Sequence, residues 1–331
     1  MNRQGKTVTE TKRFLLEKPR RTSVSAVPGA IRRMAYARRS RFLLSLARHD
    51  KAIRNAGDKK YKVSVCAIFK DEAEFLKEWL EYHLIIGIEH FYMYDNNSGD
   101  EYLSVLQPYI DNNTVTLVKW KPLHAQMAAY QDAIQRFSGE TRWMGFIDID
   151  EFLVPLKGSK VYDVLQPFNG KAGAVLIYWK FFGTSGIEQR DPDKLVTEQF
   201  TASYPKYLDI GKCFYNTAFQ FGGDIEGKNN VLHHVFWCKW KNHWIPPVNV
   251  QGHISFMNYN NLNNKDLQLQ LNHYKTKAKA DYIHNMNNKT DVFFEENPRT
   301  MEELETIEAR CTGKDENILR FLPELKRRMS K

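Results

Sequence analysis

The sequence has no long hydrophobic run and no closely spaced cysteines. No apolar stretch among its 331 residues approaches the roughly 18 residues that a membrane-spanning helix needs. The first residues are polar and are followed by no apolar core, so we expect no secretory signal. The four cysteines, Cys66, Cys213, Cys238 and Cys311, form no Cys-x-x-Cys pair. These absences favour reduced thiols and a cytoplasmic protein.

An excess of positive charge is lacking outside the N-terminal segment. The formal net charge of the chain is +9, but residues 1–57 contain fifteen Lys and Arg against three Asp and Glu, a balance of +12. The remaining residues contain 33 Lys and Arg against 36 Asp and Glu, a balance of −3. A nucleic-acid-binding fold carries basic residues on its own surface, so this distribution argues against a specific nucleic-acid partner.

The basic segment 1–57 is predicted to be an arm that precedes the folded domain. Residues 1–30 are polar and aperiodic and contain Pro19 and Pro28, which favours disorder. Residues 31–56 combine arginines with a short apolar face, which is typical of a basic amphipathic helix. Such a helix either lies on an anionic membrane, as a peripheral contact from the cytoplasmic side, or packs against its own domain. The sequence leaves both interpretations open.

A regular alternation of apolar and amphipathic segments begins at residue 61. Helices are predicted between strands, and the strands themselves at residues 62–69, 89–94, 114–120 and 142–147. Four strands that alternate with helices indicate an α/β fold with a mostly parallel, doubly wound sheet. We assign residues 58–290 to this domain. Ligands of such sheets bind at the carboxyl ends of the strands.

The second half of the chain is less regular. Residues 174–182 predict another strand, whereas residues 200–272 are rich in aromatics, His, Asn and Gly. We expect the latter to form irregular β and loop structure over one face of the sheet and to contact the acceptor. Residues 291–331 are predicted to be a helical extension that contains the capping box Thr300-x-x-Glu303.

Three carboxylates stand within four positions directly after the predicted strand at residues 142–147. Asp148, Asp150 and Glu151 repel one another, and burying them costs free energy unless a positive charge neutralises them. Mg²⁺ or Mn²⁺ suits this task, because both prefer hard oxygen ligands and complete their coordination with water and phosphate oxygens. In the structural alternative, Asp148 and Asp150 cap a turn and Glu151 pairs with a lysine.

Four groups of residues together resemble the GT-A glycosyltransferases of family 92 and family 2. They are FKDEA at 69–73 with EWLEYH at 78–83, FYMYDNNS at 91–98, FIDIDEF at 146–152 and LNHY at 271–274. The resemblance covers about residues 61–285 and implies the GT-A fold. It also implies a metal-dependent enzyme that moves a sugar from a nucleotide sugar, expected to be a UDP-sugar, to a glycan or glycolipid acceptor. Such an enzyme would invert the anomeric centre and build a cell-surface glycan.

The resemblance also implies roles for single residues on the nucleotide side. Asp71 and Glu72, after the first strand, would contact the nucleotide, and Asp95 with Asn97, after the second strand, would hold the uracil or ribose. The residues themselves allow a bland alternative as well. Asp71 and Glu72 stand where they can cap the following helix, and Asp95 can form an ordinary Asx-turn.

The metal side follows in the same way. The resemblance implies that Asp148 and Asp150 bind Mn²⁺ or Mg²⁺ and through it the diphosphate, and that His273 completes the metal site. Asp148 would also touch the ribose or the sugar. A buried structural histidine is the alternative for His273.

Inversion requires a carboxylate that removes the proton of the acceptor hydroxyl. Asp224 and Glu226, in a glycine-containing loop, are the first candidates for this base, and Glu188 is a third. The sequence departs from the family pattern after Lys212, where it reads KCFYN at 212–216. The resemblance therefore assigns neither the acceptor contacts nor the cation that faces the leaving group.

One other type of site and two other functions are compatible with parts of the sequence. The spacing of His233, His234, Cys238, His243 and His253 matches no standard four-ligand zinc pattern, so structural zinc is not expected. A sugar-phosphate nucleotidyltransferase also needs paired acids and a metal, but the glycine-rich N-terminal signature of that class is lacking. A non-catalytic protein that binds membrane or nucleic acid through its basic arm is the remaining alternative.

Overall fold

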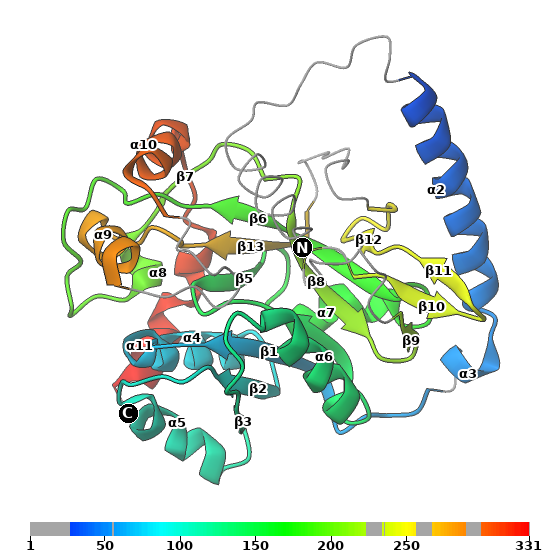
Figure 1. Ribbon diagram of the computed structural model, residues 1–331, viewed down its shortest axis with the longest axis horizontal. Helices are drawn as coiled ribbons and strands as arrows, with labels where there is room; N and C mark the ends of the chain where they lie inside the picture. The colour runs from blue at the N-terminus through cyan, green and yellow to red at the C-terminus, as the bar shows by residue number, and fades with distance from the viewer. Residues whose placement is uncertain are drawn as a thin grey trace, which may run out of the picture.

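The structure is a computed structural model, and it describes residues 27–54, 56–222, 234, 236–255, 267–288 and 299–330. Its centre is a nine-stranded sheet in the order β3-β2-β1-β4-β8-β6-β13-β5, with β12 paired to β6 (Figure 1). The bounds of these strands are β1 Tyr61–Phe69, β2 His90–Asp95, β3 Val115–Lys119, β4 Thr141–Phe146, β5 Glu151–Pro155, β6 Ala174–Phe181, β8 Gly211–Asn216, β12 Val248–Asn249 and β13 Leu269–His273.

The four predicted strands form one parallel half of this sheet. β1 pairs in parallel with both β2 and β4, and β2 pairs in parallel with β3. Both faces are covered, because every residue of β1 from Val63 to Phe69 is buried. Apolar runs of this kind occur in parallel strands that pack helices on both sides. The expected α/β class with a mostly parallel sheet is therefore confirmed.

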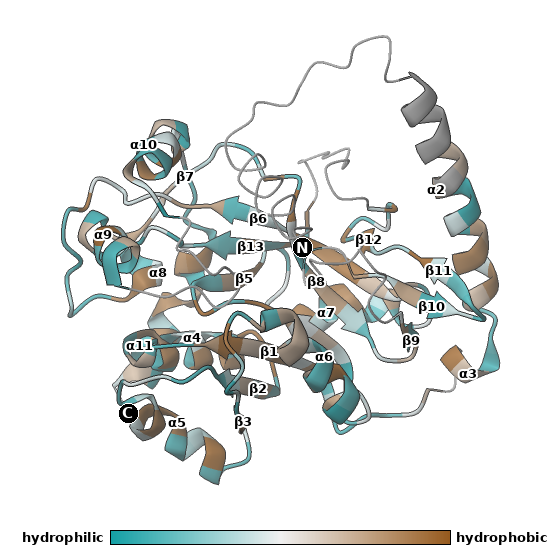
Figure 2. Ribbon diagram, viewed as in Figure 1, coloured by the Kyte–Doolittle hydropathy of each residue, from teal (hydrophilic) through white to brown (hydrophobic). Residues whose placement is uncertain are grey.

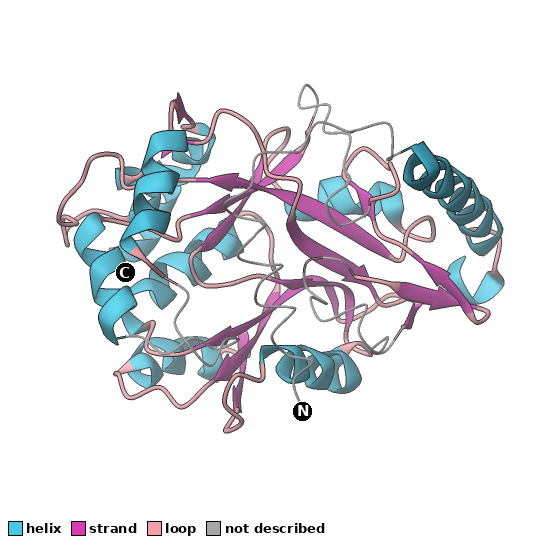
Figure 3. Cartoon of the chain, turned by 45° about the horizontal axis from the view of Figure 1, so that its top comes forward, coloured by secondary structure: helices cyan, strands magenta, loops and turns pink. Residues whose placement is uncertain are grey.

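Helices between these strands cover the sheet from two sides. The connections place β2 and β3 on one side of β1 and β4 on the other, and right-handed crossovers then put α6 on the face opposite α4 and α5. In Figure 3 the strands run through the middle of the molecule with the helices around them. The helices and the 3₁₀ turn of this half are α4 Ala73–Ile85, α5 Tyr102–Asp111, α6 Gln126–Phe137, α7 Val161–Leu165 and η2 Gln166–Phe168.

The composition led us to expect the region 200–272 over one face of the sheet, but described residues of this region form a strand of the sheet itself. β8 is inserted into the sheet and pairs antiparallel with β4 on one side and β6 on the other. The close approach needs Gly211, since a Cβ there would collide with the backbone oxygen of Ile177. The expectation was wrong for β8, because a short strand that is buried on both faces lacks the alternation of apolar and polar residues that would predict it.

Smaller elements complete the second half. A three-stranded sheet orders its strands β11-β10-β9, and β14 pairs with β7. Thr300 caps α10 as predicted, since its side chain accepts a hydrogen bond from the backbone N–H of Glu303 at 3.1 Å. Bounds of these elements are β7 Ala202–Ser203, β9 Gln220–Phe221, β10 Cys238–Trp240, β11 His243–Ile245, β14 Gly313–Lys314, α8 Val196–Gln199, α9 Lys279–Asn288, α10 Met301–Arg310, η4 Asn317–Phe321 and α11 Leu322–Met329.

The N-terminal arm contains two helices, α2 (Val27–Ala47) and α3 (Lys51–Arg54). α2 packs beside β11 at one edge of the molecule, with Leu43, Leu44 and Ala47 buried (Figure 1). The interpretation that the arm packs against its own domain is therefore confirmed for this part of the chain. None of the helices that the structure describes combines the length and the apolar character needed to cross a bilayer.

Candidate functional site

The predicted acid cluster lies at the carboxyl end of β4, where Asp148 is held by three side chains. Lys212 Nζ, from β8, lies 2.7 Å from Asp148 Oδ2. From α6, Gln126 Nε2 donates to Asp148 Oδ1 at 3.1 Å and the Tyr130 hydroxyl donates to the same oxygen at 3.3 Å. The Asp148 side chain keeps 33% of its surface exposed, so it faces solvent while its orientation is fixed.

Glu151 lies behind Asp148 and is completely buried. Its Oε1 accepts a hydrogen bond from Trp179 Nε1 at 2.6 Å, and its Oε2 accepts one from the Asp148 backbone N–H at 2.8 Å. Lys212 Nζ is 3.6 Å from the same Oε2. The structural alternative for Glu151, a pair with a lysine, is what the structure contains.

Lys212 is the positive charge that the cluster requires. Its side chain is fully buried, and burial alone would lower the pKa of the ammonium, but Asp148 and Glu151 together raise it. Burial raises the pKa of Glu151, as do the charges of Asp148 and Asp150, whereas Lys212 opposes that rise. The ammonium is therefore protonated, and it binds both carboxylates.

Trp79 of α4 fixes the backbone of the turn between β4 and β5. Its indole Nε1–H donates to the carbonyl oxygen of Asp148 at 3.1 Å and to that of Glu151 at 2.9 Å. The indole is fully buried, so these bonds are shielded from water. The sequence singled out Trp79 only as part of the resemblance, although a buried tryptophan needs a partner for its N–H.

Asp150 faces His273 across the junction of β5 and β13. The two strands are antiparallel, with His273 opposite Glu151, and the N–H of Tyr274 donates to the Asp150 carbonyl at 2.8 Å. His273 Nε2 lies 3.5 Å from Asp150 Oδ2. The structure thus brings together residues 123 positions apart that the resemblance had placed in one metal site.

The Asp150 carboxylate is held in its charged form. Burial would raise its pKa, but interactions with His273, Lys277 and Arg299 together hold that pKa well below its usual range. Lys277 is 96% buried in a left-handed conformation (φ 48°), with Nζ 4.3 Å from the ring centroid of Phe75. Sequence reasoning missed Lys277, because nothing in a Lys-rich loop distinguishes one buried lysine.

Asp150 and His273 are the residues that fit a divalent cation. Asp150 Oδ1 and His273 Nδ1 are buried, and neither has a hydrogen-bond partner among the described residues. A carboxylate oxygen and an imidazole nitrogen suit Mn²⁺ or Mg²⁺, and water and phosphate oxygens fill the other positions. Asp148 contributes less readily, since Lys212 occupies one of its oxygens. Within the described part of the chain, no group of three or more His, Cys, Asp or Glu side chains converges as a preformed metal cluster.

On the nucleotide side, the Asp95 carboxylate is engaged within the protein, although not in the Asx-turn of the bland alternative, which needs a bond to the N–H two residues on rather than three. Its Oδ1 accepts the backbone N–H of Ser98 at 2.9 Å, and its Oδ2 accepts the Tyr102 hydroxyl at 2.9 Å and lies 3.2 Å from Lys119 Nζ. Asn97, which has φ 60°, donates through Nδ2 to the backbone oxygen of Lys121 at 3.0 Å.

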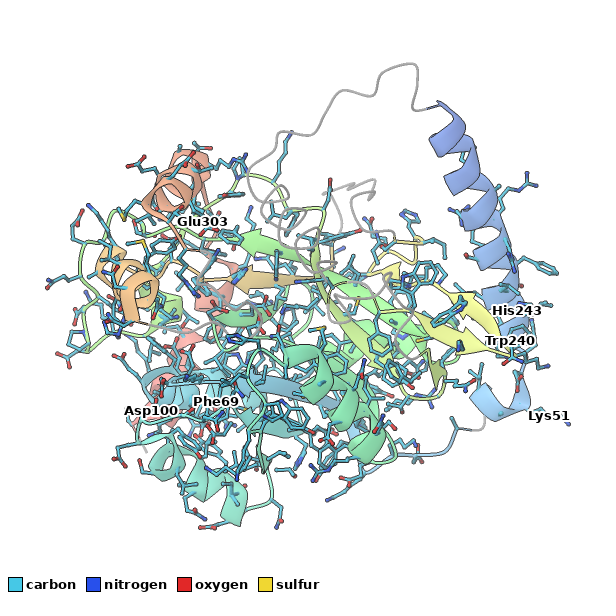
Figure 4. The ribbon with its side chains drawn as sticks, in the orientation of Figure 1. Lys51, Phe69, Asp100, Trp240, His243 and Glu303 are labelled. Carbon is cyan, nitrogen blue, oxygen red and sulfur yellow. The ribbon has the colours of Figure 1, made fainter. Side chains whose placement is uncertain are left out.

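The loops after β1 and β2 meet, as their places at the sheet edge predicted. Asp71 has φ 53° and accepts the backbone N–H of Gly99 at 2.7 Å, while its own N–H donates to Ser98 Oγ at 3.0 Å. The prediction that Asp71 caps the following helix is wrong. Asp100 Oδ2 accepts the first N–H of α4, that of Ala73, at 2.7 Å, and Glu72 stands at the N-cap with no side-chain cap bond. Figure 4 labels Phe69, the end of β1, and Asp100 at this edge.

Of the three candidate bases, the structure describes Glu188 alone. Asp224 and Glu226 lie outside the described part of the chain. The side chain of Glu188 is 74% exposed and pairs with Lys279 Nζ at 3.2 Å.

The histidines and cysteine considered for zinc lie in different settings. His234 Nδ1 is 2.6 Å from the Gly211 carbonyl, Cys238 is buried in β10, and His243 and His253 are exposed. His233 lies outside the described residues.

Replacing Lys212 tests how far the cluster depends on its ammonium. Lys212→Met removes the ammonium that binds the Asp148 and Glu151 carboxyl groups, so we expect the free energy of unfolding to fall by about 3–5 kcal/mol in urea denaturation. Adding Glu151→Gln should recover part of this loss. Lys314→Met, at a lysine on β14 that keeps 65% of its side chain exposed, is the control and should cost little. Equal losses in Lys212→Met and Lys314→Met would contradict the assignment.

The chain is similar to proteins of one family over most of its length. The model of glycosyltransferase family 92 matches residues 59–306. A family 92 protein of Ricinus communis is 35% identical over 136 residues, which are 40% of this chain and 25% of that protein. The beta-1,4-galactosyltransferase galt-1 of Caenorhabditis elegans is 31% identical over 125 residues, 34% of this chain and 29% of that protein. These matches therefore span under a third of the relatives' own lengths.

Among solved structures, the crystal structure of Staphylococcus aureus TarS 1-349 covers 47% of this chain and 47% of its own, with 14% identity and a TM-score of 0.31. A likeness this weak carries no argument about function. The family match spans well over half of the chain and includes every segment on which the resemblance was based. The chain therefore belongs to glycosyltransferase family 92, a family of the GT-A type.

Proposed function

We propose that this protein is a metal-dependent glycosyltransferase that moves a sugar from a UDP-sugar to a glycan or glycolipid acceptor with inversion. The observation that carries the proposal is the pairing of Asp150 with His273 beside the fixed carboxylate of Asp148, at the carboxyl ends of β4 and β13. Family membership supports the reaction class and disfavours a nucleotidyltransferase or a purely binding protein.

The donor sugar that we propose is galactose. Relatives named as beta-1,4-galactosyltransferases support it, among them galt-1 and the galactan beta-1,4-galactosyltransferase GALS3 of Arabidopsis thaliana, which is 33% identical over 107 residues. GALS3 is named for a galactan, so a glycan of the cell surface is the acceptor class that this comparison favours. Transfer from an α-linked UDP-galactose to a β-linkage is an inversion.

Each side chain of the cluster then has a separate task. Asp150 and His273 would hold the cation, which supplies Lewis-acid stabilisation of the charge that grows on the leaving diphosphate. Asp148, held by Lys212, Gln126 and Tyr130, is positioned toward the ribose or sugar. Lys277 places a further fixed positive charge near Asp150, and such preorganised charge favours a transition state in which negative charge develops.

We assign proton removal from the acceptor to Asp224 or Glu226, which lie outside the described residues. The acceptor hydroxyl must lose its proton as it attacks the anomeric carbon, and a carboxylate is the base that such a reaction uses. The pairing of the exposed Glu188 with Lys279 makes Glu188 the weakest of the three candidates.

The release of UDP from UDP-galactose measures this mechanism. With Mn²⁺ and a glycan acceptor, we expect the double variant Asp148→Ala, Asp150→Ala to lose about 100-fold or more of its rate, because charge stabilisation at the diphosphate is lost. EDTA should abolish release by the unmodified protein. Asp111→Ala, at an exposed acid that ends α5, is the matched control and should keep full activity. Unchanged release in the double variant would sink the mechanism.

We also propose that α2 makes a peripheral contact with an anionic membrane on its cytoplasmic side. Three large apolar side chains of α2 remain exposed, Met34 at 67%, Phe42 at 63% and Leu46 at 42%. Figure 2 shows apolar and polar residues together along this helix. Exposed cations that can attract anionic lipids accompany them, namely Arg38, Arg39 and Arg41.

Vesicle sedimentation tests this contact. Phe42→Ser with Leu46→Ser removes apolar area that would enter the interface, so we expect binding to phosphatidylglycerol vesicles to weaken about tenfold. Leu103→Ser, at a leucine of α5 that is 45% exposed, should leave vesicle binding unchanged. The proposal fails if neither change at α2 matters, or if the protein binds neutral phosphatidylcholine vesicles equally well.

A further inference from the structure

A hollow lies between the arm and the amino end of β4, away from the acid cluster. It has a volume of about 450 Å³, and the turn after α2, α3, β4 and the loop after η2 contribute to its lining. The residues that matter for its chemistry are Arg48, His49, Arg142 and Lys171. This hollow is larger than a water site, since one water takes about 30 Å³ of liquid volume.

Positive charge dominates the lining. Arg48, Arg142 and Lys171 are permanent cations, and no carboxylate stands among the described residues that line the hollow. Asp50, which is close to Arg48 in the sequence, binds residues that do not line the hollow. Its Oδ2 accepts Trp240 Nε1 at 2.9 Å and lies 3.7 Å from Lys241 Nζ, and its Oδ1 accepts the backbone N–H of Ala52 at 2.9 Å. An anion in the hollow would therefore face cations from three separate segments, namely the turn after α2, β4 and the loop after η2.

Arg142 is the least exposed of these three cations. One guanidinium nitrogen donates to the carbonyl of Ala56 at 2.8 Å, which ties β4 to the end of the arm. Its Nε is buried and has no hydrogen-bond partner among the described residues. Burial lowers the pKa of this guanidinium. A half-buried cation whose buried donor is unused is stabilised when an anion supplies the missing partner.

The hollow is separate from the donor site. Arg142 is the second residue of β4, whereas Asp148 follows the carboxyl end of the same strand. Six residues of extended chain span about 20 Å, so the two ends cannot share one diphosphate. An anion that binds near Arg142 is therefore not the nucleotide part of the donor.

We propose that this hollow binds a phosphate group of a small phosphate ester. The forked donors of Arg48 and Arg142 match two phosphate oxygens each, and Lys171 adds a point charge. The volume leaves room for an organic group on the phosphate. A soluble phosphate ester and the glycerol phosphate headgroup of a phospholipid share this chemistry. The site goes beyond the proposed transfer reaction, since it takes no part in the chemistry at Asp148 and Asp150.

Calorimetric titration of the full chain with sn-glycerol 3-phosphate tests the site. We expect binding to the unmodified protein and at least about tenfold weaker binding to the double variant Arg48→Glu, Lys171→Glu, because two charge-assisted contacts are replaced by repulsion. Both side chains are exposed, so the fold should survive, and UDP release should be unchanged. Lys314→Glu makes the same type of charge change on β14 and should bind as the unmodified protein does.

Two outcomes would overturn the proposal. They are no binding of glycerol 3-phosphate to the unmodified protein, and equal affinity in the double variant. Competition by phosphatidylglycerol vesicles separates the two sources of the phosphate group. Vesicles that displace glycerol 3-phosphate support a lipid headgroup in the hollow, and binding that vesicles leave intact supports a soluble ester.

Discussion

The buried ammonium of Lys212 is the interaction on which the rest of the site depends. It lies 2.7 Å from Asp148 and 3.6 Å from Glu151, so two carboxyl groups that follow β4 share one positive charge from β8. Without it, burying Glu151 as an ion would cost several kcal/mol. Because β8 lies between β4 and β6, the same ammonium also ties the parallel half of the sheet to the half that carries His273.

That arrangement gives the acids of the cluster two different roles, an internal ion pair for Asp148 and Glu151 and an available cation ligand at Asp150. Asp148 and Glu151 are paired within the protein, whereas Asp150 faces His273 and retains a buried oxygen without a hydrogen-bond partner among the described residues. A cation can therefore bind at Asp150 while Asp148 keeps a fixed orientation toward the donor. Trp79 holds the connecting turn by its backbone, so neither acid can move without breaking buried hydrogen bonds.

The sequence predicted the parallel half of the fold well, because strands buried on both faces and helices with a 3.6-residue period leave strong local patterns. It also predicted that Asp150 and His273 lie close together, but only through resemblance, since their approach depends on pairing between β5 and β13. Lys212 and Lys277 could not be assigned roles from the sequence. Tertiary contacts determine which lysine is buried, and the local sequence does not show them. Tertiary contacts also explain why Asp100, and not Asp71, accepts the first N–H of α4.

The central claim is that Asp150 and His273 hold the cation while Lys212 stays with Asp148 and Glu151. Anomalous diffraction at the manganese edge, from crystals grown with Mn²⁺ and UDP, tests it most directly. The account predicts one manganese peak at coordination distance, about 2.0–2.3 Å, from an Asp150 oxygen and a His273 nitrogen. It also predicts that the Lys212 ammonium remains bound to Asp148. A manganese peak that touches neither Asp150 nor His273 would contradict the account.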